Sequence, residues 1–156
     1  MVFRSSWRMF KSMQDSAFAV ALLIYALAVL YAWRVLPGGE TLKLQRTLLW
    51  PGAFFALSWL AIMATPPLRS RLSRHLWISF QTGFGQSVTS VLVGVGVIAA
   101  AAGLIFWQTH DATRGGRYPA GVFSGYGAGM GLLLAQVILV RALERNPEIR
   151  RAIEEP

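Results

Sequence analysis

The chain has 156 residues, of which 54% are hydrophobic and 14% are charged, whereas a soluble domain of this size has about 25% charged residues. Its formal net charge is +8 and it has no cysteine, which excludes disulfides and thiolate metal sites. The basic excess suits anionic lipid head groups, whereas nucleic-acid binding would need more polar surface than this composition provides.

The apolar residues gather into four blocks, at residues 17–36, 47–65, 86–107 and 119–140. A bilayer core about 30 Å thick needs roughly 20 helical residues, so each block is long enough to cross it. The short connectors predict antiparallel neighbours. The sequence therefore predicts one all-α domain over residues 1–156, an integral membrane four-helix bundle with short interfacial helices.

Two features mark the boundaries of the second span. Pro51 is expected in its first turn, where a missing N–H has little effect, and Pro66 and Pro67 end it. The connector 66–85 carries leucines spaced one turn apart, which predicts a short helix at the membrane interface.

The N-terminal residues 1–16 predict an interfacial amphipathic helix. Basic residues lie on one helical face and aromatic residues on the adjacent face, a pattern typical of helices that lie at a membrane surface. The segment also resembles an uncleaved mitochondrial import signal, although a bacterial cytoplasmic flank would be similar.

The C-terminal residues 141–156 predict a short polar helix. Asn146 is its expected N-cap and Pro147 its first helical residue. Glu144 and Glu148 are expected to pair with arginines on the same helical surface. The nearly balanced charge of the tail fits either a solvated helix or a docking site for a soluble partner.

Lysine and arginine are distributed unevenly between the two sides of this four-span topology. Ten of them lie in the N-terminus, the 66–85 connector and the C-terminus, and five lie on the other side, four in the other two connectors and Arg34 near the end of the first block. The positive-inside rule therefore predicts that both termini face the cytoplasm or the mitochondrial matrix. The inner mitochondrial membrane is favoured, with a bacterial inner membrane as the alternative. Six basic residues on the more basic side are the predicted lipid head-group contacts: Arg4, Arg8, Lys11, Arg69, Arg71 and Arg74.

The central parts of the four blocks contain no Asp, Glu, Lys, Arg or His. Proton relays, coupled transporters and voltage sensors place such residues inside the bilayer. The chain also lacks a phosphate loop, an HExxH motif and a nucleophile elbow. We therefore expect no catalytic residue, metal or cofactor, although a bound phospholipid such as cardiolipin is compatible with the sequence.

Small residues recur at four-residue spacing in the third and fourth blocks. This spacing lets two helix backbones approach closely in lipid, where helix association depends on van der Waals contact and hydrogen bonds. Either the third and fourth spans pack together as a hairpin, or one glycine row packs internally and the other meets a second protein or another copy. Eight glycines are the predicted packing or partner positions: Gly94, Gly96, Gly103, Gly121, Gly125, Gly127, Gly129 and Gly131.

The stretch RYPAGVFSGYGAGMG at residues 117–131 resembles the second half of the glycine-zipper small subunit of the mitochondrial cristae-organising complex (MICOS). The resemblance, taken over residues 83–140, implies a helical hairpin with basic loop residues Arg114 and Arg117, and an aromatic–proline pair at Tyr118 and Pro119. It implies a zipper of alternate glycines from Gly125 to Gly131, facing a thinned zipper at Gly94 and Gly96. The family has two spans, whereas two more precede them here. Kinship would imply membrane shaping or association with inner-membrane energy-converting complexes.

Three function hypotheses follow from these patterns. The first is a non-catalytic accessory subunit of an energy-converting membrane complex, a respiratory-chain complex or ATP synthase, with other membrane subunits and lipids as partners. The second is a small channel or transporter formed by several copies, and the third is a membrane enzyme that uses His75 or His110 as a base. The polar residues that would line the pore of the channel are Ser87, Thr89, Ser90, Ser124, Tyr126 and Gln136.

Overall fold

A computed structural model of the chain describes residues 2–82, 84–117 and 119–154, with the side chains of 2–3 and 84–95 outside the description. The described residues are helical except for short turns, and they contain no strand. The predicted all-α class is therefore confirmed. The helical elements are α1 (Val2–Val35), α2 (Glu40–Leu44), the π-helical turn η1 (Gln45–Leu49), α3 (Trp50–Ala64), α4 (Pro66–Gln81), α5 (Phe84–Thr113), α6 (Ala120–Leu143) and α7 (Pro147–Glu154).

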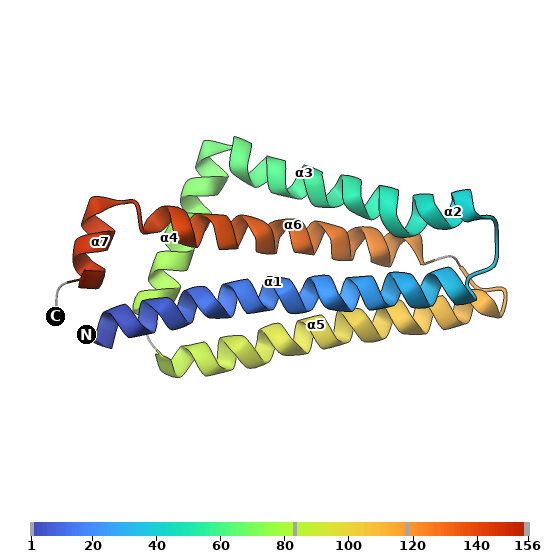
Figure 1. The fold of residues 1–156 in the computed structure, drawn as a ribbon, viewed down its shortest axis with the longest axis horizontal. Coiled ribbons are helices and arrows are strands. Elements are labelled where there is room, and N and C mark those ends of the chain that lie inside the picture. The colour runs from blue at the N-terminus through green and yellow to red at the C-terminus, as the bar shows by residue number, and fades with distance from the viewer. Residues whose placement is uncertain (1, 83, 118, 155–156) are drawn as a thin grey trace.

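Four long helices, α1, α3, α5 and α6, lie side by side along the long axis of the molecule (Figure 1). Helix α4 crosses one end of this group, and both termini and α7 lie at the same end. The connections from α1 to α2 and from α5 to α6 lie at the opposite end. The predicted antiparallel order and the shared end of the termini and the 66–85 connector agree with this arrangement.

Three stretches of the described residues are long and apolar enough to cross a membrane: Arg4–Val35, Glu40–Ala64 and Ala120–Leu143. Their outward surfaces are apolar, as shown by Leu23 and Leu57, whose exposed fractions are 61% and 62%. These helices support a membrane protein. The remaining predicted span, 86–107, falls within α5 and lies partly outside the described side chains.

Helix α1 joins the amphipathic N-terminal segment and the first apolar block into one continuous rod of 34 residues. At 1.5 Å per residue the rod is about 51 Å long, which exceeds the thickness of a bilayer core. The aromatic face of its first turns does not lie free at the interface, because Trp7 is 2% exposed and packs against Trp77 and Phe80 of α4. Helix α4 therefore covers the aromatic face of the predicted amphipathic segment within the chain.

Pro51 lies in the first turn of α3, as predicted, but the helical path begins earlier, at Glu40, and runs through α2 and η1. In an α-helix the amide of residue 51 would donate to the carbonyl of Thr47, but proline has no N–H. The chain adopts the π-helical turn η1 at this point, and the hydroxyl of Tyr25 in α1 donates to the Thr47 carbonyl. A side chain from a neighbouring helix thus replaces the donor that the proline lacks.

Helix α4 confirms the short helix predicted in the 66–85 connector. Its Leu76 is buried with Trp7 of α1, Leu139 and Val140 of α6, and Ile153 of α7 in one hydrophobic cluster near the termini. A second cluster lies between α1, α5 and α6, where the small side chains of α1 permit close contact. The two clusters tie the ends of the long helices together.

The predicted polar turn at residues 108–118 is shorter in the structure, because α5 continues to Thr113. The turn begins where Gly115 adopts φ +88°, a conformation that favours glycine. The amide of Gly116 donates to the carbonyl of Asp111 over 3.0 Å and completes the helix end. Tyr118, the aromatic residue of the pair implied by the MICOS resemblance, lies outside the described residues.

Candidate interaction surfaces

Helices α6 and α3 pack closely at Gly127 and Gly131. A methyl group built on Gly127 would overlap the carbonyl oxygen of Pro51 and lie 2.9 Å from its carbonyl carbon. One built on Gly131 would overlap the carbonyl oxygen of Phe55 and the hydroxyl of Ser58. These two glycines therefore let the backbones of α3 and α6 meet, as small residues do in membrane helices.

A hydrogen bond crosses the same contact. The Ser58 hydroxyl lies 2.9 Å from the carbonyl oxygen of Ala128 in α6 and 3.0 Å from that of Phe55 in its own helix. Because the hydroxyl can donate to either oxygen, Ser58 joins the two backbones directly. The partner of this glycine row is α3, so the prediction that the third and fourth spans pack together through these glycines is wrong.

The other glycine row of α6 faces open space. A methyl group on Gly121, Gly125 or Gly129 would have nothing within 4 Å among the described atoms. The exposed Leu132 continues this face, and the half-buried Gln136 follows it one turn later. Within the described part of the chain, the Gln136 amide has no hydrogen-bond partner. One glycine row of α6 therefore packs internally, and the other is open in the described part of the chain.

The predicted glycines of α5 have no such internal contact. Methyl groups on Gly96 and Gly103 would also meet nothing within 4 Å. Gly94 lies in the part of α5, residues 84–95, whose side-chain surroundings are outside the description. Gly96 and Gly103 therefore make no close helix contact among the described atoms.

Two tyrosines connect α1 to α6 near the middle of the molecule. The Tyr126 hydroxyl donates to the carbonyl of Ala21 over 2.7 Å, and its ring stacks on Tyr25 with the centroids 5.9 Å apart. The Tyr126 side chain therefore makes its polar and ring contacts within the chain, with α1. Ser124 lies on nearly the opposite side of α6, so the structure does not bring these two predicted pore residues together. Three others, Ser87, Thr89 and Ser90, lie outside the described side chains.

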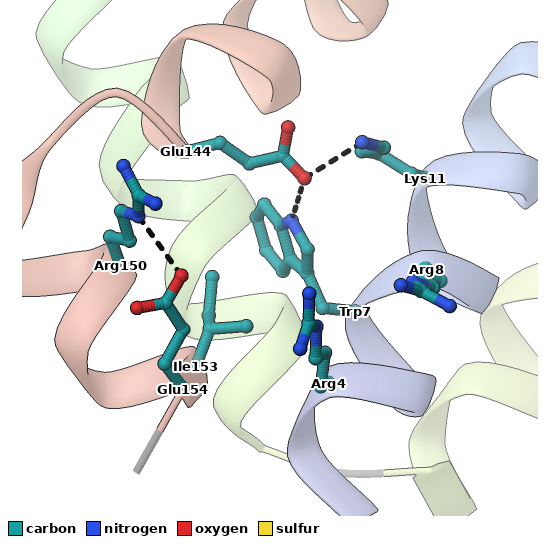
Figure 2. Close-up of a pocket in the computed structure, with 8 residues that line it drawn as sticks. All are labelled: Arg4, Trp7, Arg8, Lys11, Glu144, Arg150, Ile153 and Glu154. Carbon is teal, nitrogen blue, oxygen red and sulfur yellow. Dashed lines mark hydrogen bonds and ion pairs between the residues drawn. The ribbon is translucent and has the colours of Figure 1, made fainter. Parts of the chain in front are cut away.

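At the end that holds the termini, carboxylates of the chain pair with partners far away in sequence. Glu144 accepts hydrogen bonds from the Trp7 indole N–H and the Lys11 ammonium, each over 2.7 Å (Figure 2). Arg141 pairs with Asp15 over 3.1 Å. The predicted pairing of Glu144 with arginines of its own helix is therefore wrong, and these contacts fasten α6 to α1.

The environment of Glu144 shifts its titration. Partial burial alone would raise the pKa of this carboxyl, but the hydrogen bonds from Lys11 and Trp7 and the charges of Lys11 and Arg141 lower it below its ordinary value of 4.5. Glu144 is thus held as a carboxylate at neutral pH.

Helix α7 folds back against α1 and does not extend freely into solvent. Asn146 caps its N-terminus as predicted, since the amide of Glu148 donates to the Asn146 side-chain oxygen over 3.0 Å. Its Ile153 is 7% exposed and belongs to the cluster around Trp7. A cleft of about 380 Å³ lies between α7 and the first turns of α1.

Four cations, two carboxylates, Trp7 and Ile153 line this cleft (Figure 2). Both carboxylates are already paired, Glu144 with Lys11 and Glu154 with Arg150 over 2.9 Å. Among the residues that the structure describes, the other two cations, Arg4 and Arg8, have no carboxylate partner. As far as the described residues show, the cleft therefore presents two guanidinium groups without a paired carboxylate.

The remaining predicted lipid contacts and bases are separated from this cleft. Arg69, Arg71 and Arg74 are exposed on α4, as is His75. His110 lies in the last turn of α5, at the opposite end of the molecule (Figure 1). The two histidines thus cannot act in one site. No group of three His, Asp or Glu side chains that could hold a metal ion occurs in the described ranges.

Comparison with known proteins adds no relative: no family model, curated protein or solved structure matches the chain.

Proposed function

We propose that the chain is a non-catalytic subunit of a larger membrane assembly, in which its four long helices span the bilayer. The observation that carries this proposal is the open glycine row of α6, at Gly121, Gly125 and Gly129. This row would be the contact surface for another membrane subunit.

The two glycine rows of α6 differ in what they gain from lacking side chains. Glycine within a helix costs about 1 kcal/mol relative to alanine. At Gly127 and Gly131 that cost is offset by the close contact with α3. The open row has no such contact with the described residues, although its spacing is the same. A helix from a partner would give these positions the same close contact.

Gln136 supports the same surface. Its half-buried amide follows the glycine row on the same face of α6. In hydrocarbon, an amide gains more from a hydrogen bond to a neighbouring helix than from lipid, which offers none. A partner helix seated on the row would supply that bond.

The distribution of charge supports the proposed topology. The end with both termini and α4 carries the larger share of lysine and arginine, so the proposal places it in the matrix or the cytoplasm. The first turns of α1 would project beyond the hydrocarbon, because this helix is longer than the bilayer core is thick.

An energy-converting complex, either a respiratory-chain complex or ATP synthase, is the proposed assembly. Three sequence features support this: spans without central ionisable residues, an N-terminus similar to a mitochondrial import signal, and the glycine pattern that resembles the MICOS subunit. A supporting subunit needs packing surfaces, whereas a proton-carrying subunit needs buried titratable groups.

Native-gel migration after mild detergent extraction tests the proposal. We expect the wild-type chain to migrate in a large complex whose subunits mass spectrometry identifies. Gly125→Ile should release the chain, because a branched side chain would hold the partner helix away. Ala26→Ile, the same side chain placed on the exposed surface of α1, should leave the complex intact. A wild-type chain that migrates alone, or equal release by both variants, would refute the proposal.

A further inference from the structure

The cleft between α1 and α7 has an excess of positive charge that the described residues do not neutralise. It contains four cations and two carboxylates, and each carboxylate is paired with a cation other than Arg4 or Arg8. The two arginines are one helical turn apart on α1, where like charges repel each other. A bound anion would relieve this repulsion.

The side chains around the two arginines are held in place by other contacts. The Trp7 indole N–H donates to Glu144, and the ring packs against Trp77 and Phe80. Since Trp7 lies between Arg4 and Arg8 in sequence, its fixed ring anchors the turn of helix that carries them. Lys11 already forms an ion pair with Glu144. The arginines are thus the cations left to bind an anion in this cleft.

The position of the cleft along α1 indicates where that anion would be found. The Asp15–Arg141 pair marks the point where the apolar parts of α1 and α6 end. Arg8 lies about 10 Å and Arg4 about 16 Å further out along the helix, at 1.5 Å per residue. The head-group layer adds about 5–8 Å to each face of the hydrocarbon. Measured along the helix axis, both residues therefore lie just outside this layer, where a head group at its edge or a dissolved molecule can approach them.

We propose that the cleft binds a phosphate group, carried either by an anionic phospholipid or by a soluble phosphate ester. The planar guanidinium offers paired N–H donors that match the oxygens of a phosphate. Two such groups one turn apart suit a ligand with two negative charges. The inference rests on the proposed membrane placement of the chain, but it does not depend on the glycine surface of α6.

The test uses the purified full chain in phosphatidylcholine nanodiscs, in two arms. In the first, phosphatidate is added to the discs and the lipid retained on the chain is counted by native mass spectrometry. In the second, glycerol 3-phosphate is titrated into the buffer and binding is measured by calorimetry. We expect one phosphate per chain in at least one arm, and the arm that shows it identifies the source.

Two double variants distinguish phosphate binding in this cleft from general electrostatic attraction to a basic surface. Arg4→Gln with Arg8→Gln should weaken binding on the order of 30-fold, as expected for two basic groups near an anionic phosphate. Arg71→Gln with Arg74→Gln removes the same charge from α4 outside the cleft, and should change binding by less than about threefold, because solvent screens separated charges. All four side chains are exposed, so neither change opens a cavity.

Binding in neither arm, or equal weakening by both double variants, would overturn the proposal. The result is independent of the native-gel experiment, because phosphate binding is measured on the isolated chain. A chain without partners could still bind phosphate through Arg4 and Arg8, and a subunit of a complex could fail to bind it.

Discussion

Replacing one glycine of α6 by alanine should have opposite effects on stability, depending on which glycine is changed. At Gly127 the new methyl group would overlap the Pro51 carbonyl oxygen and lie 3.0 Å from the Pro51 Cα atom. Since these are backbone atoms, no side-chain rotation relieves the contact, and α3 and α6 must move apart. At Gly125 the methyl group would have nothing within 4 Å.

The magnitudes follow from two opposing effects. Overpacking a well-packed contact costs about 1–3 kcal/mol, while the change from glycine to alanine within a helix contributes about 1 kcal/mol of stability. We therefore expect Gly127→Ala to lower the free energy of unfolding by up to about 2 kcal/mol. Gly125→Ala should raise it by up to about 1 kcal/mol.

Reversible unfolding of the purified chain by titration with sodium dodecyl sulfate, followed by far-UV circular dichroism, measures this difference. The two variants carry the same chemical change two residues apart on one helix, so each serves as the control for the other. Equal effects of Gly127→Ala and Gly125→Ala would show that α3 does not pack against this row, and would refute the reasoning.

Three further changes probe the contacts between helices. Ser58→Ala should lower the free energy of unfolding by about 0.6 kcal/mol in the same titration, because the hydrogen bond to the Ala128 carbonyl is lost; no change would show that this bond is not formed. Tyr25→Phe should lower it by about 1 kcal/mol, since the Thr47 carbonyl loses its donor, and a stability equal to wild type would contradict this account of the π-helical turn. Glu144 has a lowered pKa, so its stabilising contribution is present above its ordinary pKa and is lost as pH falls through the lowered value. Glu144→Gln should remove that part of the pH dependence, about 0.5–1 kcal/mol for so exposed a pair; identical pH profiles of variant and wild type would contradict it.

The sequence by itself determined the helices and their order. A helix depends on contacts within about four residues, so apolar periodicity and caps are visible in the chain. The start of α7 illustrates this, because the cap at Asn146 and the helix that follows Pro147 lie next to each other. The antiparallel order followed equally directly from the short connectors.

The tertiary structure alone decided which surfaces meet. Four-residue spacing places Gly127 and Gly131 on one face, as it does Gly121 and Gly125, but spacing does not specify the partner of either face. In the folded chain α3 packs against the row with Gly127 and Gly131, and the row with Gly121 and Gly125 is left open. In the same way, the pairing of Glu144 with Lys11 joins residues 133 positions apart. Such contacts depend on the path of the whole chain, which local periodicity does not encode.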